Sequence, residues 1–580
     1  MYIYGGKKAI QAIILTFFYL NVTQCDQKIS TNENDSLSEH INTIKAAGTA
    51  NEDISIRADE ANKTVSEPSL ASYSILPTPT YSTVLNQTLN GTALQYINTS
   101  DPLVQYDLEC KADDTFCNKV SKAVGAAIDE FTRVVNIKNS LLIKVSYYSF
   151  CEVACSNDTY GWGIPTSQFT LPFEEGADLN YVYPQALAKQ LAPYSSTSVW
   201  SQYDVEITIN HDVYMNAVDM DQATEDGWNG SKVPSNGKFW FLNDTEILDF
   251  QIDFRIIILH ELLHGLGLLS AWAAYFLTNK SPFKSLVDGI IDPLELQLVT
   301  PGPYWYINQD TGPAYITGFQ PTMIFDKYLM VVDSSFSNTT QISPLSTLSF
   351  DMQNFCVDTN NDAFIINFIR LFNSANQSTT AHKLWVSLSQ PETLRFQFQP
   401  PQVANSSYNL NSYLNQTYQN MTLMTGKDLF TEVSYETTDP AINRPGLMMA
   451  HLDDRYAETV DFLMTQDYPL GNTLDTLVNR YYNTIPHIRY NITTNHTKVE
   501  TYRSPIGPGI LRMLDSIGYS TILTRTNYTT EGNVKAPKPR SSCDDNNSNH
   551  GIKPTPSPTS QASFLSPSLY FVFFCASIIF

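Results

Sequence analysis

Residues 255–269 read RIIILHELLHGLGLL, and this stretch decides how the chain around it must fold. Apolar residues surround its polar ones on every side, so we expect a helix buried in the interior of the protein. His260 and His264 stand four residues apart, which places both imidazoles on one face of that helix, about one turn from each other. Both can therefore reach one metal ion, beside which Glu261 can hydrogen-bond a water.

The pattern HExxH at 260–264 is typical of zinc peptidases. Zinc lowers the pKa of its water, and the glutamate takes the proton as that water attacks a carbonyl. The composition of the chain predicts only about 0.005 matches by chance. The alternative is a buried helix with two incidental histidines, which is disfavoured because burying such polar groups without a metal or partners costs free energy. We therefore predict Zn2+ as cofactor, held by His260 and His264, with Glu261 as the catalytic base.

A third ligand must come from outside the helix. Gly267 completes HExxHxxG, but the position three residues later, where the short metzincin motif has its third histidine, holds Ser270. His451 is the favoured candidate, because Met464 follows it inside an apolar FLM and a buried Met on a tight turn forms the floor of a metzincin site. The alternatives are His211, His487, Asp288 and Glu295.

Three segments resemble leishmanolysin and related metzincin peptidases: HELLHGLG (260–267), AHLDDRYAETVDFLM (450–464) and SPIGPGILRMLDSIGY (504–519). The resemblance spans roughly residues 107–525. It implies an α+β, zincin-like catalytic domain with a mixed sheet, an active-site helix and a large insertion between the second and third zinc ligands. It also implies a zinc endopeptidase with His260, His264 and His451 as ligands, Glu261 as base and Met464 as the Met-turn residue.

The pattern around the motif helix agrees with a mixed α/β unit. Apolar spacing predicts a helix over 119–135, and alternating or β-branched residues predict strands over 140–150 and 203–210. The strand at 203–210 is our candidate for an edge strand that pairs with an extended peptide substrate. An ordinary core strand is the alternative.

Both ends of the chain resemble processing signals. Residues 1–25 have the layout of a secretory signal peptide, with a transmembrane anchor as the alternative. Residues 552–580 combine a polar spacer with an apolar tail, the layout of a GPI-attachment signal, with a tail anchor as the alternative. The parts predicted between them are a disordered leader rich in Ser, Thr and Asn (26–105), an N-terminal catalytic subdomain (106–279), an insertion (280–445), a C-terminal catalytic subdomain (446–525) and a stalk (526–551).

Composition supports an extracellular protein. The chain of 580 residues carries a net charge of -23, which disfavours nucleic acid as a partner. It has about nineteen Asn-x-Ser/Thr sequons, a density that predicts a glycoprotein. The glycosylation candidates are Asn86, Asn90, Asn98, Asn157, Asn243, Asn338, Asn415 and Asn491. Disulfides are expected in the secretory pathway, and four cysteines crowd one region and are expected to pair among themselves: Cys110, Cys117, Cys151 and Cys155.

These features together predict a secreted zinc metalloendopeptidase that is anchored by GPI to the outer leaflet of the plasma membrane and cleaves extracellular proteins or peptides. The alternative is a surface or adhesion glycoprotein that keeps a metzincin fold without catalysis.

Overall fold

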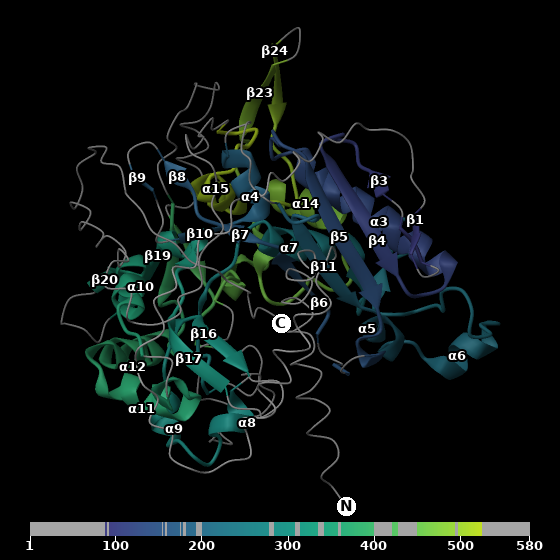
Figure 1. Ribbon diagram of the computed structural model, residues 1–580. Helices are drawn as coiled ribbons and strands as arrows, with labels where there is room; N and C mark the ends of the chain where they lie inside the picture. The colour runs from purple at the N-terminus through teal and green to yellow at the C-terminus, as the bar shows by residue number, and fades with distance from the viewer. Residues whose placement is uncertain are drawn as a thin grey trace, which may run out of the picture. The chain divides into compact units, whose positions relative to one another are not determined.

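The structure is a computed structural model (Figure 1), and every residue it describes falls within one compact unit, Val84–Phe580. The second unit, Met1–Thr83, lies outside the described residues, as do the predicted signal peptide, stalk and GPI signal. The described ranges are 87–89, 92–94, 96–152, 155–156, 159–173, 176–177, 181–192, 200–277, 283–307, 314–333, 341–357, 361–398, 420–426, 449–493 and 497–524.

A five-stranded mixed sheet supports the motif helix. Its order is β3 (Tyr96–Asn98), β4 (Val104–Cys110), β5 (Leu141–Tyr148), β11 (Val205–Asn210) and β6 (Gly161–Pro165). The three central strands run parallel, while β3 and β6 run antiparallel to their neighbours. The inward side chains of β5 and β11, such as Ile143, Val145 and Ile207, are fully buried, whereas Leu108 and Cys110 at the end of β4 are partly buried.

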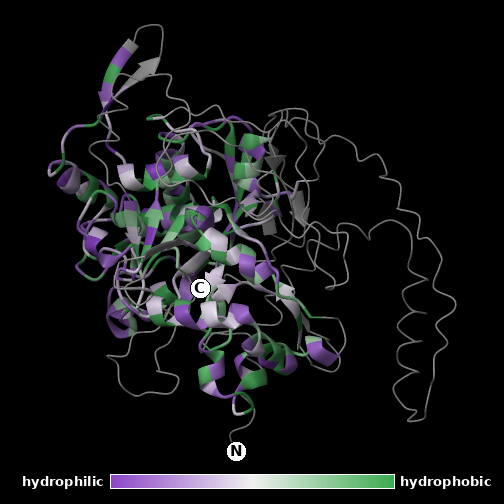
Figure 2. Cartoon of the chain, turned by 90° about the vertical axis from the view of Figure 1, so that its left-hand side faces the viewer, coloured by the Kyte–Doolittle hydropathy of each residue, from purple (hydrophilic) through white to green (hydrophobic). Residues whose placement is uncertain are grey.

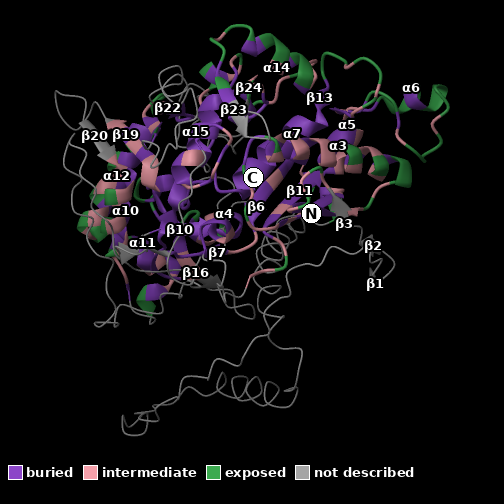
Figure 3. Ribbon diagram, turned by 90° about the horizontal axis from the view of Figure 1, so that it is seen from above, coloured by how far each residue is buried: buried purple, intermediate pink, exposed green. Residues whose placement is uncertain are grey.

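Two helices pack on this sheet and on each other. Helix α3 (Asp114–Thr132) is capped by Asp113, whose side chain accepts the Thr115 amide, and it buries Phe116, Val120 and Val124 at helical spacing. Helix α7 (Phe254–Gly265) is the motif helix, and all of its residues are buried, as the region around its label in Figure 3 shows. The helix ends where Gly267 takes a φ of 118°, a conformation that favours glycine.

The predicted insertion folds onto the same core. Strands β19 (Leu329–Asp333), β20 (Gln341–Pro344), β21 (Leu394–Gln397) and β22 (Asn420–Leu423) form a four-stranded antiparallel sheet in the order β20-β19-β21-β22. Beside it lie the hairpin of β16 (Pro303–Ile307) and β17 (Ala314–Phe319) and the helices α10 (Leu345–Gln353), α11 (Ile365–Ser374) and α12 (Asn376–Leu388). Figure 2 shows hydrophobic and hydrophilic residues alternating along the helical ribbons, as expected where one face is buried.

The last described segment returns to the motif helix. It holds the 3-10 turns η5 (Asp454–Tyr456) and η6 (Phe462–Met464), helix α14 (Leu474–Tyr482), the hairpin of β23 (Arg489–Thr493) and β24 (Thr497–Thr501), and helix α15 (Pro508–Ile517). Buried residues from all three predicted parts belong to one hydrophobic cluster, for example Ile258, Phe368 and Leu511. The insertion therefore shares its core with the two parts that flank it.

The remaining elements are short. The helices are α4 (Gln185–Leu191), α5 (His211–Asn216), α6 (Met220–Glu225), α8 (Lys284–Val287), α9 (Pro293–Leu296), η2 (Phe150–Glu152), η3 (Ile324–Tyr328) and η4 (Asn361–Ala363). The strands are β1 (Gln87–Leu89), β2 (Thr92–Leu94), β7 (Gln168–Phe169), β8 (Pro172–Phe173), β9 (Gly176–Ala177), β10 (Tyr181–Pro184), β12 (Phe239–Trp240), β13 (Ile252–Asp253), β14 (Trp272–Ala273), β15 (Thr300–Pro301) and β18 (Thr322–Met323).

Several sequence expectations can be compared with these elements. The expected mixed α/β organisation is confirmed, with α3, β5, β11 and α7 in the predicted order. Strands β1 to β3 lie at residues 87–98, inside the segment for which we predicted disorder. The pairing of the four crowded cysteines is confirmed as Cys110–Cys117 and Cys151–Cys155. Cys356 is disulfide-bonded too.

Candidate metal centre

Helix α7 presents His260 and His264 on one face, as their spacing predicts. Their Nε2 atoms lie 3.1 Å apart, and the two rings meet edge to face. Both side chains are only 2 % exposed, so neither nitrogen has bulk water as a partner. Asp253 caps the helix: its carboxylate accepts the Arg255 amide and pairs with the Arg255 guanidinium inside the core. This buried pair anchors the helix that carries both histidines.

Each helix histidine is oriented through its other ring nitrogen. His260 Nδ1 lies 2.8 Å from the Leu463 carbonyl oxygen, and His264 Nδ1 lies 2.7 Å from the Leu268 carbonyl oxygen. A carbonyl oxygen only accepts, so each Nδ1 must carry the hydrogen. Burial lowers the pKa of His260 to about 3, with a further contribution from His264, and burial lowers the pKa of His264 to about 4. Both rings are therefore neutral at pH 7, and each turns an unprotonated Nε2 toward the other.

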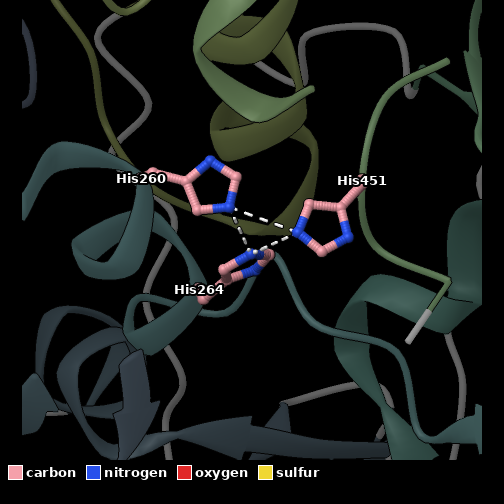
Figure 4. A group of neighbouring side chains, drawn as sticks. All are labelled: His260, His264 and His451. Carbon is pink, nitrogen blue, oxygen red and sulfur yellow. Dashed lines mark hydrogen bonds between the residues drawn. The ribbon is translucent and has the colours of Figure 1, made fainter. Parts of the chain in front are cut away.

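His451 completes a triangle of nitrogens (Figure 4). Its Nε2 lies 3.2 Å from His260 Nε2 and 3.3 Å from His264 Nε2. These three residues form the group, among the described residues, whose ligand atoms could hold a metal ion. His451 lies in the segment that follows the insertion, 187 residues from His264, and is 5 % exposed.

The donor set fits a small divalent cation. Tetrahedral zinc with Zn–N bonds of about 2.0–2.1 Å places neighbouring ligand nitrogens about 3.3–3.4 Å apart. The three observed separations are within about 0.3 Å of that value. Without a cation, the lone pairs of His260 and His264 would face each other inside a buried site, which is electrostatically unfavourable. Three nitrogen ligands also leave one tetrahedral position open, as in catalytic zinc sites.

Glu261 lies beside the triangle with two hydrogen-bond partners. Its Oε1 accepts the Tyr468 hydroxyl at 3.0 Å, and its carboxylate accepts the backbone amide of Gly163 in β6. Burial raises the pKa of Glu261 to about 7, although both hydrogen bonds act to lower it. The Tyr468 ring also packs edge to face on the His260 ring, with centroids 5.2 Å apart. Sequence reasoning missed Tyr468, because nothing in the pattern four residues after Met464 marks it.

Met464 lies at the end of η6, and the backbone of this turn contacts the ligands. Leu463 supplies the carbonyl oxygen that orients His260, and Met464 supplies the carbonyl oxygen that accepts the Leu452 amide at 2.7 Å. Asp461, which precedes the turn, is fully buried, and its Oδ1 accepts the amides of Gly509 and Ile510 at 2.8 and 2.9 Å. These two hydrogen bonds therefore tie the turn to the first residues of α15.

The other candidates for the third ligand lie away from the triangle. His211 Nδ1 contacts the Tyr147 hydroxyl at 3.0 Å, and His487, Asp288 and Glu295 are exposed. None of these four belongs to the metal-binding group found in the described residues. Ser270 donates to the buried carboxylate of Asp326 at 2.6 Å and so has a structural partner of its own.

The proposed substrate strand needs correction. β11, the strand predicted over 203–210, pairs with β5 on one side and β6 on the other, so it is an interior strand of the sheet. β6 is the terminal strand of that sheet in the part of the chain described here. The alternative that we weighed, a core strand, is what the structure shows for 203–210.

The glycosylation candidates fall mostly outside the described residues. Asn243 is exposed, while Asn98 and Asn491 lie in strands β3 and β23. Asn86, Asn90, Asn157, Asn338 and Asn415 lie outside the described residues. Among the helices that the structure describes, none has the length and apolar character needed to cross a bilayer.

The fold and the site define a mixed α/β protein with a buried three-histidine cluster beside a buried glutamate. The chain belongs to the SPBPB7E8-like family, whose profile matches residues 80–226 and 230–563. Uncharacterized protein PB7E8.01 of Schizosaccharomyces pombe is 24 % identical to it over 179 residues, which cover 29 % of this chain. That match spans about a quarter (26 %) of the length of the yeast protein. No solved structure matches the chain.

Proposed function

We propose that this protein is a zinc-dependent metalloendopeptidase with a metzincin-type catalytic domain, similar to the leishmanolysin family. The observation that supports this most strongly is the meeting of three imidazole Nε2 atoms at 3.1–3.3 Å, with Glu261 as their neighbour. Two of these nitrogens come from one helix and the third from a distant segment, followed by a Met-containing turn. This is the ligand arrangement that the resemblance implies.

In this proposal the three histidines bind the metal and Glu261 transfers the proton. His260, His264 and His451 would hold zinc, which would supply Lewis acidity and lower the pKa of a water. Glu261 accepts the proton from the attacking water and passes it to the leaving amine. A glutamate whose pKa is raised toward neutrality by burial suits both steps, because it can take up and release a proton near pH 7. Tyr468 donates to Oε1 of that carboxylate, and the Gly163 amide donates to the carboxylate as well, so both groups hold Glu261 in position.

The substrate in this proposal is an extended protein segment. β6 is antiparallel to β11 and lies at the end of the sheet, and its Gly163 amide touches the Glu261 carboxylate. A peptide pairing with β6 by β-augmentation would therefore pass beside the candidate base. Extracellular proteins are the proposed targets, because the sequons and the two end segments favour a GPI-anchored protein of the cell surface.

One observation favours a second candidate, a non-catalytic surface glycoprotein with a structural metal site. Glu261 and His451 are each 5 % exposed, and the helix histidines are 2 % exposed. A structural zinc site is closed, whereas a catalytic one must admit substrate. In this alternative Glu261 serves only to hold Tyr468.

The deciding experiment compares Glu261→Gln with the parent, with Glu295→Gln as the control at an exposed glutamate. We expect about one zinc per chain in all three proteins, and a loss of turnover on an unfolded protein substrate of at least about a hundredfold in Glu261→Gln alone. Equal turnover in Glu261→Gln and the parent would remove the proposed mechanism. A zinc-loaded parent with no turnover on any unfolded protein would favour the glycoprotein alternative.

A further inference from the structure

The segment that carries His451 is held on both sides by backbone hydrogen bonds. On one side the Leu452 amide donates to the Met464 carbonyl at 2.7 Å, and Leu452 forms a parallel bridge with Thr465. On the other side the Met424 amide donates to the His451 carbonyl at 2.9 Å, and Leu452 bridges Leu423 in an antiparallel sense. His451 itself lies in no helix or strand, so these contacts set its position.

The second set of contacts comes from the insertion. Leu423 ends β22, which pairs with β21 through Leu394↔Leu423, Arg395↔Thr422 and Phe396↔Met421. Strand β21 pairs in turn with β19, and helix α12 packs against β19. The segment 451–453 therefore continues the insertion's sheet beyond β22. The third imidazole is attached to a sheet that lies between the second and third ligands in the sequence.

Tyr456 adds a side-chain contact to this joint. Its hydroxyl accepts the Thr422 amide at 3.1 Å, while the Asp453 amide donates to the Thr422 carbonyl at 3.1 Å. Both the amide and the carbonyl of Thr422 are therefore hydrogen-bonded to the segment that follows His451. Tyr456 is 4 % exposed, so water cannot easily replace its hydroxyl.

We infer that the insertion is a structural part of the metal centre, and that Tyr456 is a positioning residue that holds the His451 segment against β22. This inference rests on the proposed metal site. Metal–nitrogen distances tolerate only about 0.2 Å, so a small displacement of the segment weakens one of the three ligands. The contact of Tyr456 with β22 involves neither helix ligand directly, because the Nδ1 atoms of His260 and His264 contact the carbonyl oxygens of Leu463 and Leu268.

The test is zinc affinity, measured by competition with a chelator, for the parent, Tyr456→Phe and Tyr214→Phe. Tyr214 is a matched control: it is 3 % exposed, and its hydroxyl donates to the Pro234 carbonyl at 2.7 Å. We expect Tyr456→Phe to bind zinc about tenfold more weakly, the size found when residues that orient metal ligands are changed. Tyr214→Phe should bind as the parent does.

Thermal unfolding of the metal-free proteins separates positioning from general stability. We expect the two variants to unfold at similar temperatures without metal, and the stabilisation on adding zinc to shrink only in Tyr456→Phe. Parental affinity in Tyr456→Phe, or equal weakening in both variants, would overturn the inference and leave the metal site intact. A parent that binds no zinc would instead overturn the proposed function, and the inference with it.

Discussion

Two carbonyl oxygens decide which nitrogen of each helix histidine faces the cluster. Leu463 and Leu268 accept from the Nδ1 atoms of His260 and His264, which leaves both Nε2 lone pairs directed inward. The HExxH spacing predicts that the two rings share a face, but it does not predict their tautomers. The oxygens that set the tautomers belong to backbone groups of apolar residues, one of them 203 residues away from its histidine.

At the residue scale, Tyr468→Phe tests whether the Glu261 carboxylate must be held. The change removes a hydrogen bond to a carboxylate, worth about 1.5–3 kcal/mol, so we expect turnover to fall about tenfold to a hundredfold. Zinc content should stay at the parental level, because Tyr468 donates to no ligand nitrogen in the described structure. Peptidase assays with parallel zinc analysis measure both quantities.

Tyr490→Phe is the control for this change, since the Tyr490 hydroxyl also donates to a glutamate, Glu500, at 3.4 Å in the hairpin β23–β24. Its turnover should match the parent. If Tyr468→Phe also keeps parental turnover, the hydrogen bond to Glu261 has no role in the reaction.

At the element scale, β6 and α7 lie in unusually close contact. A Cβ added to Gly163 would overlap the backbone of Glu261, and neither main chain can move aside cheaply. We expect Gly163→Ala to destabilise the fold by about 3 kcal/mol, the upper end of the range typical of overpacking, because the added atom would meet backbone. Chemical denaturation monitored by circular dichroism gives this free energy of unfolding.

Gly230→Ala controls for the loss of a glycine, because a Cβ there meets no neighbour, although its φ of 88° carries some backbone strain. It should cost about 1 kcal/mol. Equal destabilisation by the two changes would mean that β6 does not contact α7 as closely as the structure shows.

The existence and type of the main helices and strands can be predicted from the sequence, but the residues at which they begin and end cannot. Apolar spacing indicated a helix over 119–135, but α3 begins five residues earlier, at Asp114, because the Asp113 side chain caps it. The strands at 140–150 and 203–210 were recognised from β-branched residues, yet alternation cannot tell an edge strand from an interior one. The short sequence GWGIP of β6 could not be predicted as a strand, because glycine does not favour extended structure. Its glycines instead allow β6 to approach α7 closely.

At the scale of the whole molecule, the sequence predicts three separate parts (106–279, 280–445 and 446–525), but in the structure they share one hydrophobic core. Predicted boundaries near 280 and 446 follow composition, whereas the core runs through all three parts. His451 could be selected from the sequence because Met464 follows it. The contacts between the His451 segment and β22 could not be predicted. Met424, Leu452 and Thr422 make them through backbone groups, which do not constrain the identity of the side chain.

The measurement that tests the account most directly is the metal content of the purified protein, with His451→Ala and a control, His382→Ala, purified alongside. His382 lies on α12 and contacts Asn373 Oδ1 at 2.9 Å, outside the cluster. We predict about one zinc per chain in the parent and in His382→Ala, and a sharp reduction in His451→Ala, because two imidazoles alone hold zinc poorly. A parent without zinc, or full zinc content in His451→Ala, would contradict the three-histidine centre.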